Sequence, residues 1–162
     1  FTQFTAMMIS ADSKYDRHIN KMTGGDFTAD EQAGYILFRQ KCSSCHTEPL
    51  FTDGSYRNNG LDEISADAGR DSLTSNRSDL GKFRVPSLRN AEITSPYMHD
   101  GRFSSLKQVL QHYNSWIHQH VNLDPLLKSG IPLNTIQQAQ LTTFLKTLTD
   151  VSFINDRRFN NH

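Results

Sequence analysis

The chain has 162 residues, of which 36% are hydrophobic, and its 17 basic and 17 acidic residues give a formal net charge of zero. This length suffices for one domain with a hydrophobic core. The balanced charge, without a basic stripe or arm, argues against nucleic acid and membrane surfaces as partners, and no apolar run approaches the roughly 20 residues of a membrane-spanning helix.

Residues 1–19 have the pattern of an amphipathic helix. Phe1, Phe4, Met8 and Ala11 fall near one face at helical spacing, and this apolar face needs a partner. The sequence begins at Phe1 with neither an initiator Met nor a signal peptide. We therefore expect it to be part of a longer gene product, with the partner of this helix in an upstream domain.

A second helix is predicted to begin after Thr28. The pattern Thr28-Ala-Asp-Glu31 predicts a capping box, in which the Thr28 hydroxyl accepts from the Glu31 amide and the Glu31 carboxylate accepts from the Thr28 amide. Residues 36–38 supply an apolar side. The helix runs into Cys42, and Pro49 makes its continuation unfavourable.

The end of this helix carries the motif Cys42-Ser-Ser-Cys45-His46, which is the attachment signature of c-type haem. Two thiols at this spacing can each add to one vinyl group of a single porphyrin, and the histidine supplies the proximal iron ligand. We expect Cys42 and Cys45 to anchor one haem c and His46 to bind its iron through Nε2. The other nitrogen should donate to a backbone carbonyl or a carboxylate.

Two other interpretations of the cysteine pair are weaker. Half of a zinc site would need further ligands, and the chain contains only these two cysteines. A thioredoxin-like redox pair would lie in a βαβ unit, and no such pattern is visible. Both cysteines of the chain fall within one motif, which favours haem attachment.

Residues 51–90 show little periodicity and many turn signals. So long an irregular segment tends to be functional or supported by a ligand, and a haem is large enough to order it. Arg84 and Arg89 could meet haem propionates, although ordinary surface positions are the favoured interpretation. Residues 94–101 then form a dense loop of possible ligands.

Two further helices are predicted. One begins with a capping box at Ser105 and carries Tyr113 on the same face as its aliphatic residues, and the other runs from about Asn134 to residue 148. Between them lie His118 and His120, which could bind a metal. No further ligand is near, and we interpret this connection as a solvated loop.

The predicted fold is therefore mainly α: a cytochrome c-like haem domain with about four main helices, long ordered loops and at most a short hairpin. Five blocks in order resemble the C-terminal half of the bacterial dihaem cytochrome c peroxidases and their MauG relatives. They lie at residues 42–46, 49–53, 85–90, 96–101 and 144–149. The resemblance covers nearly the whole chain.

The resemblance implies a domain organisation and a function. Residues 28–162 would form a c-type cytochrome domain, and residues 1–27 a helix and linker toward a missing N-terminal haem domain. In the family, the N-terminal haem reacts with hydrogen peroxide. The C-terminal, six-coordinate haem takes electrons from a small donor protein and relays them.

This chain has one haem motif instead of the family's two. It would therefore be the electron-transfer domain of a peroxidase or MauG-like oxidoreductase, weakly active or inactive alone. The alternative is a stand-alone monohaem electron carrier. Haem c attachment also implies a periplasmic or otherwise exported location.

The resemblance also implies a distal ligand and a calcium site. The position that holds the ligating Met in the peroxidases falls on Tyr113, and MauG-like members carry Tyr there. Met98 is the alternative, because a thioether is the common partner of His in cytochromes, and a histidine stands behind both. The backbone carbonyls of Thr94 and Pro96 would bind the interdomain calcium, an ordinary turn being the alternative.

Overall fold

A computed structural model describes residues 2–159 and confirms the mainly α fold class. Its helices are α1 (Thr2–Met7), α2 (Lys14–Ile19), α3 (Ala29–Lys41), α4 (Asp71–Thr74), α5 (Leu106–Gln111), α6 (Thr135–Lys146) and α7 (Val151–Ile154). Short 3₁₀ turns occur at η1 (Arg77–Asp79), η2 (Ala91–Ile93) and η4 (Pro125–Leu127), and a π-helical turn, η3 (His112–Trp116), continues α5. Among the described residues, no helix is long and apolar enough to cross a membrane.

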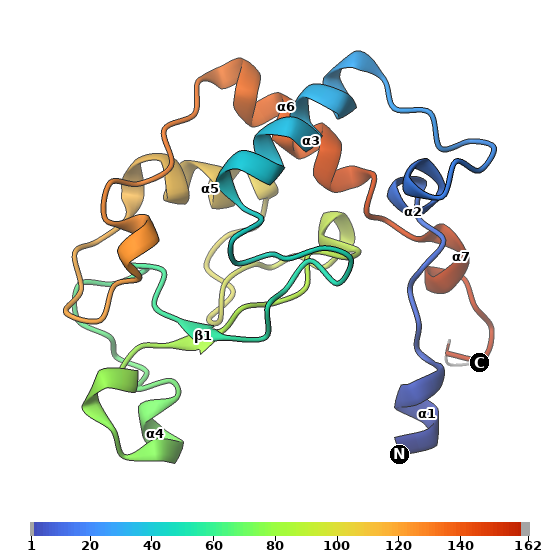
Figure 1. Ribbon diagram of the computed structural model, residues 1–162. Coiled ribbons are helices and arrows are strands. Elements are labelled where there is room, and N and C mark those ends of the chain that lie inside the picture. Colours follow the sequence, from blue (N-terminus) through green and yellow to red (C-terminus); the bar gives the residue numbers. More distant parts are fainter. Residues whose placement is uncertain (1, 160–162) are drawn as a thin grey trace.

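The helices α3, α5 and α6 form a layer above the long irregular segment that joins α3 to α5 (Figure 1). Within that segment, β1 (Tyr56–Arg57) and β2 (Phe83–Arg84) pair antiparallel, with Tyr56 opposite Arg84. The two strands come from distant parts of the segment, so their pairing closes the residues between them into a loop. They are not joined by a short hairpin turn.

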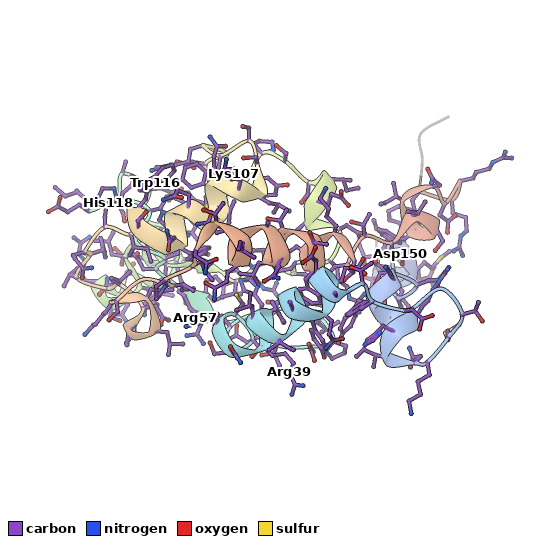
Figure 2. The ribbon with its side chains drawn as sticks, turned by 90° about the horizontal axis from the view of Figure 1, so that it is seen from above. Arg39, Arg57, Lys107, Trp116, His118 and Asp150 are labelled. Carbon is purple, nitrogen blue, oxygen red and sulfur yellow. The ribbon has the colours of Figure 1, made fainter. Side chains whose placement is uncertain are left out.

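The crossing of α3 over α6 is the centre of the hydrophobic core (Figure 2). Gly34 makes it possible, because a Cβ at this position would collide with the backbone carbonyl of Gln140 on α6. Phe38 and Phe144 meet beside this contact at a centroid distance of 5.1 Å, and both are fully buried. Phe51, from the loop after the cysteine motif, packs against Phe38 at 5.4 Å and brings that loop onto the core.

The structure has an N-cap at each of the three predicted helix starts, which are Thr28, Ser105 and Asn134. Thr28 and Asn134 form complete capping boxes with Glu31 and Gln137. These hydrogen bonds close within one turn, so they need no tertiary partner to form.

The prediction of one helix over residues 1–19 is wrong for the described part, and Phe1 lies outside the described residues. The helix stops after Met7, and Ser13 caps a new helix through a capping box with Asp16. A serine whose hydroxyl binds a backbone amide favours a helix start over a helix interior, which explains the break. In α2, Tyr15 is buried in the core.

Arg89 also differs from expectation. Its side chain is only 12% exposed, because both terminal nitrogens bind the Asp16 carboxylate of α2. The ordinary surface position expected for it is therefore wrong, whereas Arg84 is exposed as expected.

Candidate haem site

The end of α3 shapes the cysteine motif into a tight turn. Cys42 is the C-cap, with its amide 2.8 Å from the carbonyl oxygen of Phe38. The carbonyl of Cys42 then accepts from the amides of Cys45, at 3.2 Å, and His46, at 3.0 Å. The turn therefore holds the two free thiols and the imidazole close together at the edge of the core, against which Cys42 packs.

His46 is oriented by two backbone carbonyls, in agreement with the expectation from the sequence. Its Nδ1 lies 3.1 Å from the oxygen of Phe51 and 3.2 Å from that of Pro86. Because a carbonyl oxygen can only accept, Nδ1 carries the proton and Nε2 presents its lone pair. Burial lowers the pKa of His46, which keeps the imidazole neutral as metal ligation requires, although both carbonyl contacts oppose the shift.

The thiols do not have the character of a redox pair or a zinc site. Burial raises the pKa of Cys42 to about 12, with a smaller contribution from Cys45, and burial also raises that of Cys45. Reactive thiols in redox motifs have lowered pKa values, so the raised pKa values of these two thiols argue against a redox pair. Within the described part of the chain, no three His, Cys, Asp or Glu side chains gather to hold a metal.

The Tyr113 phenol lies near the two cysteines. It projects from η3, where the π-helical turn departs from the α-helical spacing that the sequence suggested. Burial raises the pKa of Tyr113, the side chain of Asn59 opposes this by hydrogen bonding to it, and the neighbouring Cys42 and Cys45 raise it further.

Met98 reaches the same region from the 94–101 loop. Its sulfur accepts a hydrogen bond from Asn59 Nδ2 at 3.4 Å, and its backbone has φ of 71°, in the left-handed region that non-glycine residues rarely adopt. Asn59 therefore contacts Met98 directly and lies near Tyr113. The sequence indicated only a turn at this position, so the contact could not be predicted from it.

Thr94 and Pro96 lie on an exposed part of this loop. Their carbonyl oxygens accept no hydrogen bond from any of the described residues. The oxygens are thus available to a hard cation, and the calcium site stays a prediction.

These residues fit a covalently bound haem. The two thiols, the imidazole with a free Nε2, and the oxygen and sulfur donors of Tyr113 and Met98 are the kinds of groups that hold such a cofactor. The orientation of His46 by carbonyl oxygens fixes the tautomer that leaves Nε2 free for iron.

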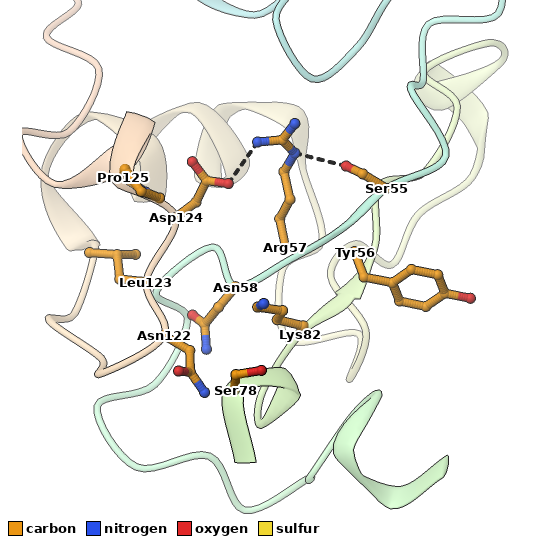
Figure 3. Close-up of a pocket in the computed structure, with 10 residues that line it drawn as sticks. All are labelled: Ser55, Tyr56, Arg57, Asn58, Ser78, Lys82, Asn122, Leu123, Asp124 and Pro125. Atoms are coloured by element: carbon orange, nitrogen blue, oxygen red, sulfur yellow. Dashed lines mark hydrogen bonds and ion pairs between the residues drawn. The ribbon is translucent and has the colours of Figure 1, made fainter. Parts of the chain in front are cut away.

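A pocket of about 280 Å³, lined mainly by polar residues, lies beside β1 (Figure 3). The guanidinium of Arg57 at its wall is occupied by ion pairs with Asp124, at 2.7 Å, and Asp53, at 2.8 Å. Behind the pocket, His120 is 8% exposed, with Nδ1 accepting from the amide of Asn122 at 3.0 Å. The interpretation of this connection as a solvated loop is therefore wrong for His120 and correct for His118, which is exposed.

The sequence is similar to those of cytochrome c peroxidases and MauG proteins. It is 33% identical over 155 residues to cytochrome c551 peroxidase of Nitrosomonas europaea, covering 91% of this chain and 42% of that protein. It is also 33% identical over 155 residues to the methylamine utilization protein MauG of Methylorubrum extorquens, covering 90% of this chain and 41% of that protein. The chain thus spans less than half the length of these relatives, and no family model matches it.

Solved structures show the same likeness. A MauG-like protein associated with microbial copper homeostasis superposes with a TM-score of 0.82 at 31% identity, covering 93% of this chain and 55% of that one. The dihaem peroxidase BthA from Burkholderia thailandensis superposes with a TM-score of 0.68 at 23% identity, covering 88% of this chain and 47% of that one. The second match concerns the fold alone.

Proposed function

Because the chain belongs to the family of bacterial cytochrome c peroxidases and MauG proteins, we propose that it is the electron-transfer haem c domain of a dihaem enzyme. In this proposal it accepts electrons from a small donor protein and passes them to a peroxide-reactive haem in an N-terminal half outside this sequence. Residues 28–162 form the cytochrome domain, and residues 1–27 lead toward the missing half.

The orientation of His46 is the observation that carries the proposal. The carbonyls of Phe51 and Pro86 hold Nδ1 from two different loops, so Nε2 points in a fixed direction beside the two thiols. A bound haem supplies an iron that changes its oxidation state by one electron. Cys42 and Cys45 would hold its porphyrin, and Tyr113 would bind the iron opposite His46.

A tyrosine ligand would set the chemistry of the site. Phenolate is an anionic, hard oxygen donor, so it favours the ferric state and lowers the potential relative to a thioether. Tyr113 therefore supports a MauG-like parent, which oxidises a partner protein. Ligation by Met98 would support a parent that reduces peroxide with electrons from a donor.

The attachment motif supports an exported location. Covalent attachment of haem c normally takes place outside the cytoplasm, and both cysteines of the chain lie in this motif. We therefore place the parent enzyme in the periplasm or an equivalent compartment.

Haem attachment is tested by mass spectrometry of protein exported from a host that has the attachment machinery. The denatured mass should exceed that of the polypeptide by one haem, and the colour should stay with the protein through acid–acetone extraction. Cys42→Ser with Cys45→Ser should lose the added mass, while Ser43→Ala with Ser44→Ala, at the two positions between them, should keep it. A bare polypeptide mass for the unaltered protein would exclude the proposal.

The competing candidate is a stand-alone monohaem electron carrier, which the single attachment motif of this sequence favours. The complete reading frame decides between the two. A second Cys-x-x-Cys-His motif upstream supports the dihaem enzyme, and its absence from the complete gene supports the carrier.

A further inference from the structure

Asn59 joins the two segments that supply the candidate distal ligands. Its side-chain Nδ2 donates to the sulfur of Met98 at 3.4 Å, and the same side chain lies near enough to the phenol of Tyr113 to act on its pKa. A primary amide has two N–H donors, so the contact with Met98 leaves one donor free. Met98 and Tyr113 come from different segments, and Asn59 comes from a third.

The backbone around Asn59 is held firmly in place. Its carbonyl accepts from Nε2 of His112 at 3.0 Å, and His112 is 1% exposed and immediately precedes Tyr113. The next residue, Gly60, has φ of 68° and lies so close to the backbone of His118 that a Cβ would stand 2.7 Å from its carbonyl oxygen. The amide of His118 in turn donates to Gly60 at 2.8 Å.

This anchoring fixes the backbone of Asn59. The His112 contact ties it to the helical turn that carries Tyr113. Met98, by contrast, belongs to a loop, and its backbone is in the left-handed region where its sulfur meets Asn59. The amide is thus carried on a fixed backbone and holds the Met98 sulfur.

We propose that Asn59 is a positioning residue that selects the distal ligand, holding the Met98 thioether away from the iron so that the Tyr113 oxygen can bind it. The inference rests on the proposed function, because it concerns the ligand of the haem. A thioether sulfur engaged by an N–H donor has less electron density to offer a metal.

The test compares ferric optical and EPR spectra of the haem-loaded protein and three variants. Asn59→Leu keeps the approximate size and removes the hydrogen bond to Met98, and Asn59→Asp keeps the shape and removes the N–H donors. In both, the ratio of Tyr-ligated to Met-ligated molecules should fall about tenfold, as expected for the loss of the hydrogen bond that holds Met98. The reduction potential should rise as the thioether replaces the phenolate.

The double variant Asn59→Leu with Met98→Leu tests the selection itself. Without a competing thioether, the spectrum should return toward that of the unaltered protein. Asn122→Ala is the matched control, because this asparagine also ties loops together, by donating to the carbonyls of Arg77 and Leu80, without meeting either ligand candidate. Its spectrum should not change.

The outcomes separate the inference from the function beneath it. Unchanged spectra in Asn59→Leu and Asn59→Asp, with a changed spectrum in Tyr113→Phe, would overturn the role of Asn59 alone. An unchanged spectrum in Tyr113→Phe would overturn the Tyr ligand and this inference together, while covalent haem on Cys42 and Cys45 would still stand by its mass. A double variant that stays altered would show that Met98 does not compete.

Discussion

Arg89 and Asp16 form a two-point ion pair across 73 residues of sequence, with Nη1 2.9 Å from Oδ2 and Nη2 2.8 Å from Oδ1. The side chains are 12% and 11% exposed. The Nε of Arg89 also donates to the carbonyl of Pro49 at 3.0 Å, just beyond the cysteine motif. One side chain thus fastens α2 and the loop after the motif to each other.

Replacing Arg89 by Met should destabilise the fold by about 3 kcal/mol, because the Asp16 carboxylate would be left buried and unpaired. Urea unfolding followed by circular dichroism measures the change. Arg158→Met is the control, since its pair with Asp156 has the Arg side chain 63% exposed and should contribute less than about 1 kcal/mol. Equal effects of the two substitutions would contradict the structural role of Arg89.

The same pair should make stability depend on acid pH. Burial raises the pKa of Asp16, but hydrogen bonds from Arg89 and Ser13 outweigh it and hold the pKa below its ordinary value of 3.8. A depressed folded-state pKa contributes stability that is fully present above the unfolded pKa and lost as the pH falls through the folded one. The difference in unfolding free energy between the unaltered protein and Asp16→Asn should therefore be constant above about pH 5 and shrink below about pH 4.

Denaturation curves at a series of pH values would measure this difference. A gap between the two proteins that widens on acidification would show that the Asp16 carboxylate is not stabilised in the folded state.

The distal ligand should respond to one of two single substitutions. Tyr113→Phe removes the phenol oxygen and should alter the ferric optical and EPR spectra and raise the reduction potential, whereas Met98→Leu should leave the ligand field unchanged. The two substitutions keep the side-chain size, so packing effects are matched. A spectrum that changes only in Met98→Leu would assign the thioether and place the protein with the ordinary peroxidases.

The isolated chain should be a poor peroxidase. An iron bound by His46 on one side and a protein ligand on the other has no open position for peroxide. Steady-state assays with hydrogen peroxide and a reduced cytochrome donor should show little turnover, while the full-length parent assayed in parallel provides the reference. Rapid turnover by this chain alone would refute the electron-transfer assignment.

Calcium should bind the full-length parent through the carbonyls of Thr94 and Pro96. Carbonyl oxygens suit calcium, and magnesium should compete poorly because it gives up its water ligands reluctantly. Isothermal calorimetry of the parent with each ion measures this. A calcium titration without heat of binding would favour a plain turn at this loop.

Local features of the fold could be predicted from the sequence. The capping boxes at Thr28 and Asn134 and the attachment motif at residues 42–46 depend on partners within a few positions, so residue spacing is enough to define them. The mainly α class followed from these short-range patterns. The break between α1 and α2 was missed because the apolar spacing of residues 1–19 masked the competing cap at Ser13.

Only the tertiary structure decided how the site is assembled. The carbonyls that orient His46 come from two loops, and the amide that holds the Met98 sulfur comes from a third. These contacts join residues far apart along an irregular segment, whose path depends on side-chain hydrogen bonds and on packing against the α3–α6 core. Sequence periodicity carries no information about such a path, because an irregular segment has no repeating geometry to reveal which side chains meet.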